Sequence, residues 1–196
     1  RASNGRWNLE TGDLGVRGPV RALRRKDLTV TASALQGNTQ QGFLDLIQPV
    51  RLEQQDGAIN AGTTRWNLAE QRLRSIAPFQ GKRQDATAMG NGFVIDEAAT
   101  TVIIPKACQL TQPGESLKAH RCSWNWATNR VVADGDVVLR RQDPDQETRA
   151  PRMEGQLGSS EGVRFGSTGQ RVQSSIRFRP DQPRSRPPSS RPRVSF

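Results

Sequence analysis

The chain has 196 residues, of which 33% are hydrophobic and 5% are aromatic, and it contains no tyrosine. This length suits one domain with or without a tail, and the low apolar share disfavours one large core and favours a flat fold buried on one face. The net charge of +10 favours anionic partners, and no segment approaches the roughly 18 apolar residues that a membrane-spanning helix needs.

A repeat with fixed offsets begins at the first residues and extends over most of the chain. An anchor residue has alanine five positions before it in all five copies and proline twelve positions after it in four, and asparagine follows it directly in four. The anchors are Trp7, Gly37, Trp66, Phe93 and Trp124; the alanines are Ala2, Ala32, Ala61, Ala88 and Ala119; the prolines are Pro19, Pro49, Pro78 and Pro105, with Asp136 in the fifth copy. Offsets held across five copies indicate a repeat protein.

Each copy is predicted to form two strands and a turn. Apolar residues alternate with polar ones, as in Trp7 and Leu9 and then Leu14 and Val16, which is the period of a half-buried antiparallel strand. Turn-forming residues separate the strands within a copy, and the segment 113–115 is a hairpin signal between copies. The recurring proline cannot donate to a central ladder, so it predicts a strand start or a bulge.

Successive hairpins predict a meander in which each strand pairs with its sequence neighbours. A sheet of about ten or more strands coils or folds over. The sequence therefore predicts an all-β fold, an elongated antiparallel β-taco or jelly-roll trough of about five to six hairpin copies. This domain spans residues 1–178, and residues 150–178 are its degenerate last copy.

The C-terminal segment, residues 179–196, is rich in proline and arginine and is predicted to be a disordered tail. It is either a solvated terminus or an arm that docks on an acidic partner. Half of the net charge lies in residues 177–196, so the remaining chain carries only +5. Together with the lack of an aromatic stacking platform in the tail, this argues against nucleic acid as a partner.

The repeat resembles the OstA-like domain of lipopolysaccharide-transport proteins, of the periplasmic LptC/LptA type. The matching segments are RWNLETGDLGVRGPVRALRR, AGTTRWNLAEQRLRSIAPF and AHRCSWNWATNRVVADGDVVLRR. The closing GQLGSSEGVRFGSTGQRVQSSIRF is similar to the C-terminal part of LptC-like chains, which favours that type.

The resemblance implies a function in binding and transfer rather than in catalysis. It implies a periplasmic carrier or bridge component that binds lipopolysaccharide, or a related glycolipid, and hands it from the inner to the outer membrane. It also implies partners: the inner-membrane transporter complex, and other bridge proteins joined by edge-strand pairing. LptC-like members carry an N-terminal membrane anchor, which this sequence does not include. The alternative function is a structural or adhesive β-repeat surface module without lipid cargo.

A glycolipid carrier needs an apolar trough for acyl chains and cations at its rim for phosphates or acidic sugars. From periodicity alone, the inward-facing residues could equally fill a closed sandwich core. The trough candidates are Trp7, Leu9, Leu46, Trp66, Leu68, Phe79, Phe93, Ile95, Trp124, Trp126, Val137 and Leu139. The rim candidates are Arg6, Arg21, Arg65, Lys118 and Arg140.

No chemical motif in the sequence predicts an enzyme. Residues 158–162 spell G-x-S-x-G, but the only histidine, His120, lies upstream, and no helix pattern follows, so a turn is expected there. One histidine and two cysteines make a metal cluster implausible, and no fingerprint for a nucleotide cofactor occurs. We therefore expect no metal and no cofactor.

The two cysteines flank the hairpin signal at 113–115. A three-residue loop there would place Cys108 directly opposite Cys122, which predicts a cross-strand disulfide in an oxidising compartment. A two-residue loop would put the pair out of line. The alternative is two small buried thiols.

Overall fold

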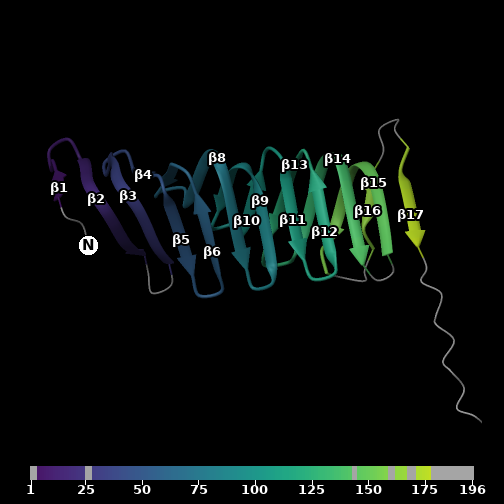
Figure 1. Ribbon diagram of the computed structural model, residues 1–196. Coiled ribbons are helices and arrows are strands. Elements are labelled where there is room, and N and C mark those ends of the chain that lie inside the picture. Colours follow the sequence, from purple (N-terminus) through teal and green to yellow (C-terminus); the bar gives the residue numbers. More distant parts are fainter. Residues whose placement is uncertain (1–3, 25–27, 143–144, 159–161, 167–170, 178–196) are drawn as a thin grey trace, which may run out of the picture.

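The computed structural model describes residues 4–24, 28–142, 145–158, 162–166 and 171–177. In these residues the regular secondary structure consists of 17 strands in one continuous sheet, and every strand pair is antiparallel. Figure 1 shows the strands side by side in one elongated body, from the purple N-terminal end to the green and yellow C-terminal end. The predicted all-β trough of repeated hairpins is therefore confirmed.

The described residues include no helix that could cross a membrane. The predicted tail at 179–196 lies outside the described residues, as does Ala2 of the first repeat.

The strands are of two kinds. Long strands form three hairpins: β2 (Asp13–Arg24) with β3 (Leu28–Asn38), β8 (Arg72–Arg83) with β9 (Ala86–Asp96), and β14 (Arg130–Gln142) with β15 (Asp145–Gln156). The short strands are β1 (Asn4–Trp7), β4 (Phe43–Ile47), β5 (Val50–Gln54), β6 (Gly57–Ala61), β7 (Thr64–Asn67), β10 (Thr101–Ile104), β11 (Cys108–Gln112), β12 (Glu115–Ala119), β13 (Arg121–Asn125), β16 (Arg164–Gly166) and β17 (Gln173–Arg177).

The sheet is bent along its length into two walls that meet at a line we call the spine. In wall A, β4 and β7 lie between β3 and β8, and β10 and β13 lie between β9 and β14. In wall B, the corresponding places are taken by β5 with β6 and by β11 with β12. The long strands run through both walls. β1 and β16 complete wall A, and β17 completes wall B.

The predicted meander is wrong in one respect, because β4 pairs with β3 and β7 but not with β5. Consecutive short strands belong to different walls, so the chain crosses the spine between them. The recurring prolines lie at these crossings, where the sequence predicted a bulge or a strand start; Pro105 is neither, since it follows the end of β10. Pro19 lies in the β2 bulge between Arg17 and Val20, Pro78 ends the β8 bulge, and Pro49 directly precedes β5.

The repeat continues through the fourth copy in a different alignment from the predicted one. Register places Trp66, Ile95 and Trp124 in one inward-facing row, so the fourth anchor is Ile95 rather than Phe93. With Ile95 the anchors lie 30, 29, 29 and 29 residues apart. The sequence comparison missed this because isoleucine replaces the aromatic anchor there.

The asparagine after each anchor closes a turn at the rim of wall A. The side-chain oxygens of Asn8, Asn38, Asn67 and Asn125 each accept a backbone N–H from the turn that follows. In the fourth copy Asp96 does the same by accepting the Ala99 N–H at 2.9 Å. These Asx turns fix the length of each turn, because the side chain replaces a backbone acceptor.

Small and large residues alternate along the wall B row that adjoins the spine. From β2 to β15 this row reads Val20, Ala32, Val50, Ala61, Phe79, Gly90, Cys108, Ala119, Val137 and Ala150. The small members allow the other wall to approach closely: a Cβ placed on Gly90 would overlap Ile104 Cγ2 of wall A. The repeating alanine is thus a packing requirement, and the fourth copy meets it with glycine.

A disulfide joins Cys108 to Cys122, with Cα atoms 5.9 Å apart. The route differs from the predicted one: the β11–β12 hairpin has a two-residue turn and places Cys108 opposite Ala119. Cys122 lies beyond the spine in β13, opposite Ile104 of wall A. The bond therefore connects the two walls from inside the core, and both cysteines are buried.

Reduction of this disulfide is expected to lower stability. The bond closes a loop with a sequence separation of 14. A loop of that size corresponds to about 3 kcal/mol in the chain-entropy model. For a chain of this size that is a fall in melting temperature of about 6–12 °C. Thermal melts followed by circular dichroism with and without reductant test it, and equal melting temperatures would contradict it.

Gly90→Ala is expected to destabilise the protein by about 1–3 kcal/mol, because the added methyl group overpacks the spine against Ile104. Gly15→Ala is the matched control, since a Cβ on that strand glycine meets nothing within 4 Å. Urea unfolding measures both, and an equal effect of the two substitutions would argue against the close-approach explanation.

Candidate functional site

A groove lies between the two walls. Because the walls meet at the spine, their turn-bearing rims face each other across a mouth. A cavity of about 440 Å³ extends inward from this mouth and is lined mainly by apolar side chains from both walls. The large apolar members are Leu28, Leu52, Ile59 and Phe79 of wall B and Leu73, Ile95, Val102, Trp124 and Trp126 of wall A.

The groove exists where wall B has small inward-facing residues. Gly57, Gly81, Ala86 and Ala88 all line it. Toward the C-terminus the same space is filled, as by Leu117 and Met153, which are completely buried. The volume is therefore left open among residues 28–126 and is filled further toward the C-terminus.

Arg83 crosses the mouth of the groove from wall B to wall A. Its guanidinium donates to Asp56 Oδ2 from Nε at 3.0 Å and from Nη2 at 2.8 Å. Its Nη1 donates to the backbone carbonyl of Trp126, in a turn of wall A, at 3.4 Å. One side chain thus holds the two rims together while it places a cation at the mouth.

A second contact closes the mouth toward the C-terminal end. Glu115, on the rim of wall B, is buried and accepts hydrogen bonds from Arg141 Nε at 2.8 Å and from Gln112 Nε2 at 3.1 Å. It also accepts the Gly158 backbone N–H of wall A at 2.7 Å. These three donors hold the carboxylate in place, and the Gly158 contact joins the two rims at this end of the trough.

The groove wall also offers a hydrogen-bond donor. Trp124 is half-buried, and its Nε1 atom is buried without a hydrogen-bond partner among the described residues. Buried indole N–H groups usually have a partner.

The predicted trough residues separate into three groups. Phe79, Ile95, Trp124 and Trp126 line the groove. The closed core contains Leu46, Trp66, Phe93, Val137 and Leu139, all at most 4% exposed. Trp7, Leu9 and Leu68 are 58%, 74% and 36% exposed. Trp7 lies on the terminal strand β1, and the two leucines lie in turns beyond the strand ends.

Five large apolar lining residues were missed, namely Leu28, Leu52, Ile59, Leu73 and Val102. They share the inward position of the predicted residues, so alternation alone could have included them. Which inward residues line open space depends on the small residues of the facing wall, and the sequence does not show which segments face each other.

The predicted rim cations lie on outer faces instead. Arg65 donates to both carboxylate oxygens of Asp45, from Nε and from Nη2, each at 2.7 Å. Arg140 Nε donates to Glu147 Oε2 at 2.7 Å. The Asp45 hydrogen bond and charge raise the pKa of the Arg65 guanidinium. Hydrogen bonds from Arg140 and then from Arg149 lower the pKa of Glu147. The cations that line the groove are Lys82 and Arg83, and Arg83 bridges the mouth.

The other motifs gain no chemical role from the structure. His120 lies at the spine with Nε2 3.1 Å from Asp136, and both side chains are exposed. Of the G-x-S-x-G string, residues 159–161 lie outside the described residues. Over the described ranges no group of three or more His, Cys, Asp and Glu could hold a metal ion.

No protein-family profile matches the sequence, and no curated protein matches it. Among solved structures, the chain is similar to LptH from Pseudomonas aeruginosa, described as the LptA-homologous periplasmic component of the conserved lipopolysaccharide transport device. The identity is 12% and the TM-score is 0.48, over 80% of this chain and 98% of that chain.

Arg83→Met is expected to loosen the mouth, because it removes the donor to the Trp126 carbonyl while it keeps a long apolar side chain. Binding of an environment-sensitive apolar dye, followed by fluorescence titration, should become tighter. Stability should change by less than about 1 kcal/mol, since the Asp56 pair is partly exposed. Arg51→Met is the control, because it removes an exposed pair with Glu53 away from the groove. Equal dye binding by both variants would contradict the role of Arg83.

Proposed function

We propose that this protein is a periplasmic carrier that binds lipopolysaccharide or a related glycolipid by its acyl chains and hands it on without catalysis. The observation that carries the proposal is the apolar groove between the walls. Its 440 Å³ falls within the range of about 300–1,000 Å³ typical of small-molecule sites. Each methylene buried there contributes roughly 0.8 kcal/mol. The resemblance of the repeat to the OstA-like domain supports lipopolysaccharide as the cargo.

The polar groups at the mouth fit an amphipathic cargo. Arg83 lies where the head of a lipid would lie when its acyl chain occupies the groove, and arginine binds phosphate in a bidentate manner. Trp124 lines the wall below, and its buried indole N–H has no partner among the described residues. The site thus combines an apolar interior with few, placed polar groups.

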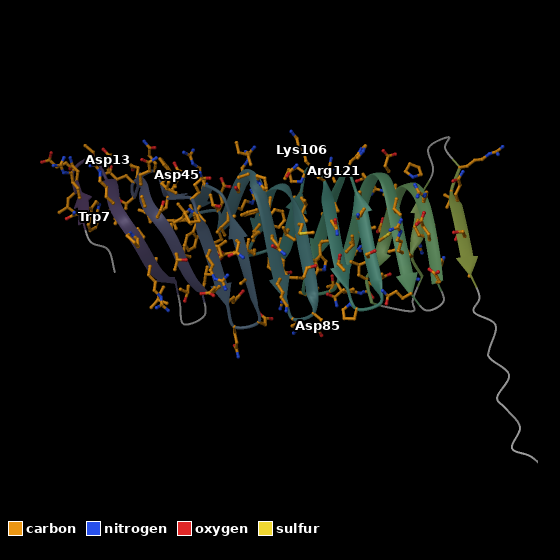
Figure 2. All side chains as sticks on the ribbon, viewed as in Figure 1. Trp7, Asp13, Asp45, Asp85, Lys106 and Arg121 are labelled. Carbon is orange, nitrogen blue, oxygen red and sulfur yellow. A yellow bond between two sulfur atoms is a disulfide. The ribbon has the colours of Figure 1, made fainter. Side chains whose placement is uncertain are left out.

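Transfer of the glycolipid requires a continuous path into a partner protein. The unpaired strand edge at the N-terminal end of the sheet could provide it. At the N-terminal end, β1 and the last part of β2 each pair on one side only within the described residues. Figure 2 shows Trp7 at this end, where its inward-facing row reaches the end of the sheet. Another chain could add strands there and extend the trough. The proposed partners are other bridge proteins and the inner-membrane transporter complex.

The disulfide supports the proposed compartment. A buried disulfide between Cys108 and Cys122 persists in oxidising surroundings such as the bacterial periplasm. An N-terminal tether to the inner membrane, as in LptC-like proteins, is part of this proposal.

The groove is tested by filling it. Ala86→Phe places a ring at the inner rim beside Arg83 without changing charge. Native mass spectrometry with lipid extraction, on protein purified from a lipopolysaccharide-producing host, should detect glycolipid on the unaltered protein and at least about tenfold less on the variant. That loss corresponds to about 1.4 kcal/mol of binding energy.

Ala34→Phe is the matched control, because Ala34 faces outward on wall A, opposite Ile47. The control should keep its lipid. An unaltered protein that carries no lipid and does not bind added lipid A would overturn the proposal. It would favour the structural or adhesive module. The hydrogen bonds of Arg83 and Glu115 across the mouth are consistent with that alternative, because they hold the two rims together.

A further inference from the structure

The outer face of wall A carries apolar and cationic side chains in adjoining positions. Register places Arg74 of β8 opposite Val94 of β9, and Val94 opposite Ile103 of β10. Their neighbours in sequence face the core, so these three side chains point outward. Adjacent strands lie about 4.8 Å apart, which makes the three residues contiguous.

Two isoleucines protrude from this face. Ile76, in the β8 bulge two residues beyond Arg74, is 84% exposed, and Ile103 is 38% exposed. Lys106 follows β10, and Arg121 begins β13 next to the Ile104–Cys122 pair. Figure 2 shows Lys106 and Arg121 along the same upper side of the molecule. We call Ile76, Val94, Ile103, Arg74, Lys106 and Arg121 the outer patch.

The outer patch has an excess of positive charge. Carboxylates on the neighbouring strands have partners of their own: Asp45 pairs with Arg65, Asp96 with Arg72 and Asp134 with Arg152, while Asp136 in the β14 bulge lies 3.1 Å from His120. Within the described residues, Arg74, Lys106 and Arg121 form no ion pair. Asp134 lies opposite Arg121 but is held by Arg152, so the three cations around the exposed apolar side chains remain in excess.

We propose that the outer patch docks this protein on a membrane surface that contains anionic lipids. Protruding aliphatic side chains insert at the boundary of headgroups and acyl chains, and lysine and arginine are attracted to anionic headgroups. An acidic protein partner fits less well, because the outer patch has none of the aromatic anchors that dominate protein interfaces. The site lies on the face of wall A that turns away from the groove.

Co-sedimentation of the full chain with vesicles tests the proposal. Vesicles of phosphatidylcholine alone are compared with vesicles that also contain phosphatidylglycerol, at low and at high salt. Arg74→Gln with Arg121→Gln should weaken binding to the anionic vesicles by about fivefold per cation removed. Ile76→Thr with Ile103→Thr should also weaken it, while threonine keeps the β-branched shape that strands favour. Thermal melts confirm that each variant is folded.

Matched controls lie on the outer face of wall B. Leu23→Thr removes an apolar residue that is 73% exposed, and Lys118→Gln removes an exposed cation. The arginine-rich segment 179–196 is the same in all variants, so its contribution to vesicle binding cancels.

Three outcomes would overturn the proposal. Patch variants that bind anionic vesicles as well as the controls do would remove the patch from the interaction. Equal binding to neutral and anionic vesicles would remove the electrostatic basis. If the patch variants lose binding to immobilised polyglutamate while their binding to vesicles is unchanged, the patch belongs to an acidic protein partner instead.

Discussion

Close approach of the two walls along the spine is the constraint on which the rest of the structure depends. A sheet of 17 strands with one apolar face must cover that face, and here it does so by bending onto itself. The two walls can pack closely at the bend only where a small residue of one wall faces each large residue of the other. Gly90 beneath Ile104 shows this directly, since a Cβ there would overlap Ile104 Cγ2, and alanines take the corresponding places in other copies. The Cys108–Cys122 bond then fixes the two walls covalently at the same line.

Much of this arrangement could be predicted from the sequence because alternation and fixed offsets are local signals. The prolines predicted bulges and strand starts, and the asparagines lie at turns in the structure. Pairing across the spine could not be predicted, since it depends on where a strand turns from one wall into the other. That is why β4 was expected to pair with β5, and why Cys122 was expected in a hairpin with Cys108.

The candidate site was harder to predict than the fold for the same reason. All inward-facing residues look alike in sequence, yet Trp66 fills the core while Trp124 lines open space. The difference lies in the opposite wall, where Gly81 and Ala88 leave a volume that larger residues occupy further along. The cation at the mouth escaped notice because Arg83 stands at a strand end among many arginines, and only its contacts with Asp56 and the Trp126 carbonyl single it out.

The nearly constant spacing of the anchors has a consequence for how such a molecule can change size. Each unit of about 29 residues adds two strands to each wall, or about 9.5 Å of length, and presents to its successor the same surface that it received from its predecessor. Duplication or loss of one whole unit would therefore lengthen or shorten the body by a fixed increment without disturbing the packing inside any other unit. A change of any other length would move the small residues away from the large ones they accommodate. The length of a body built in this way therefore changes in steps of one whole unit.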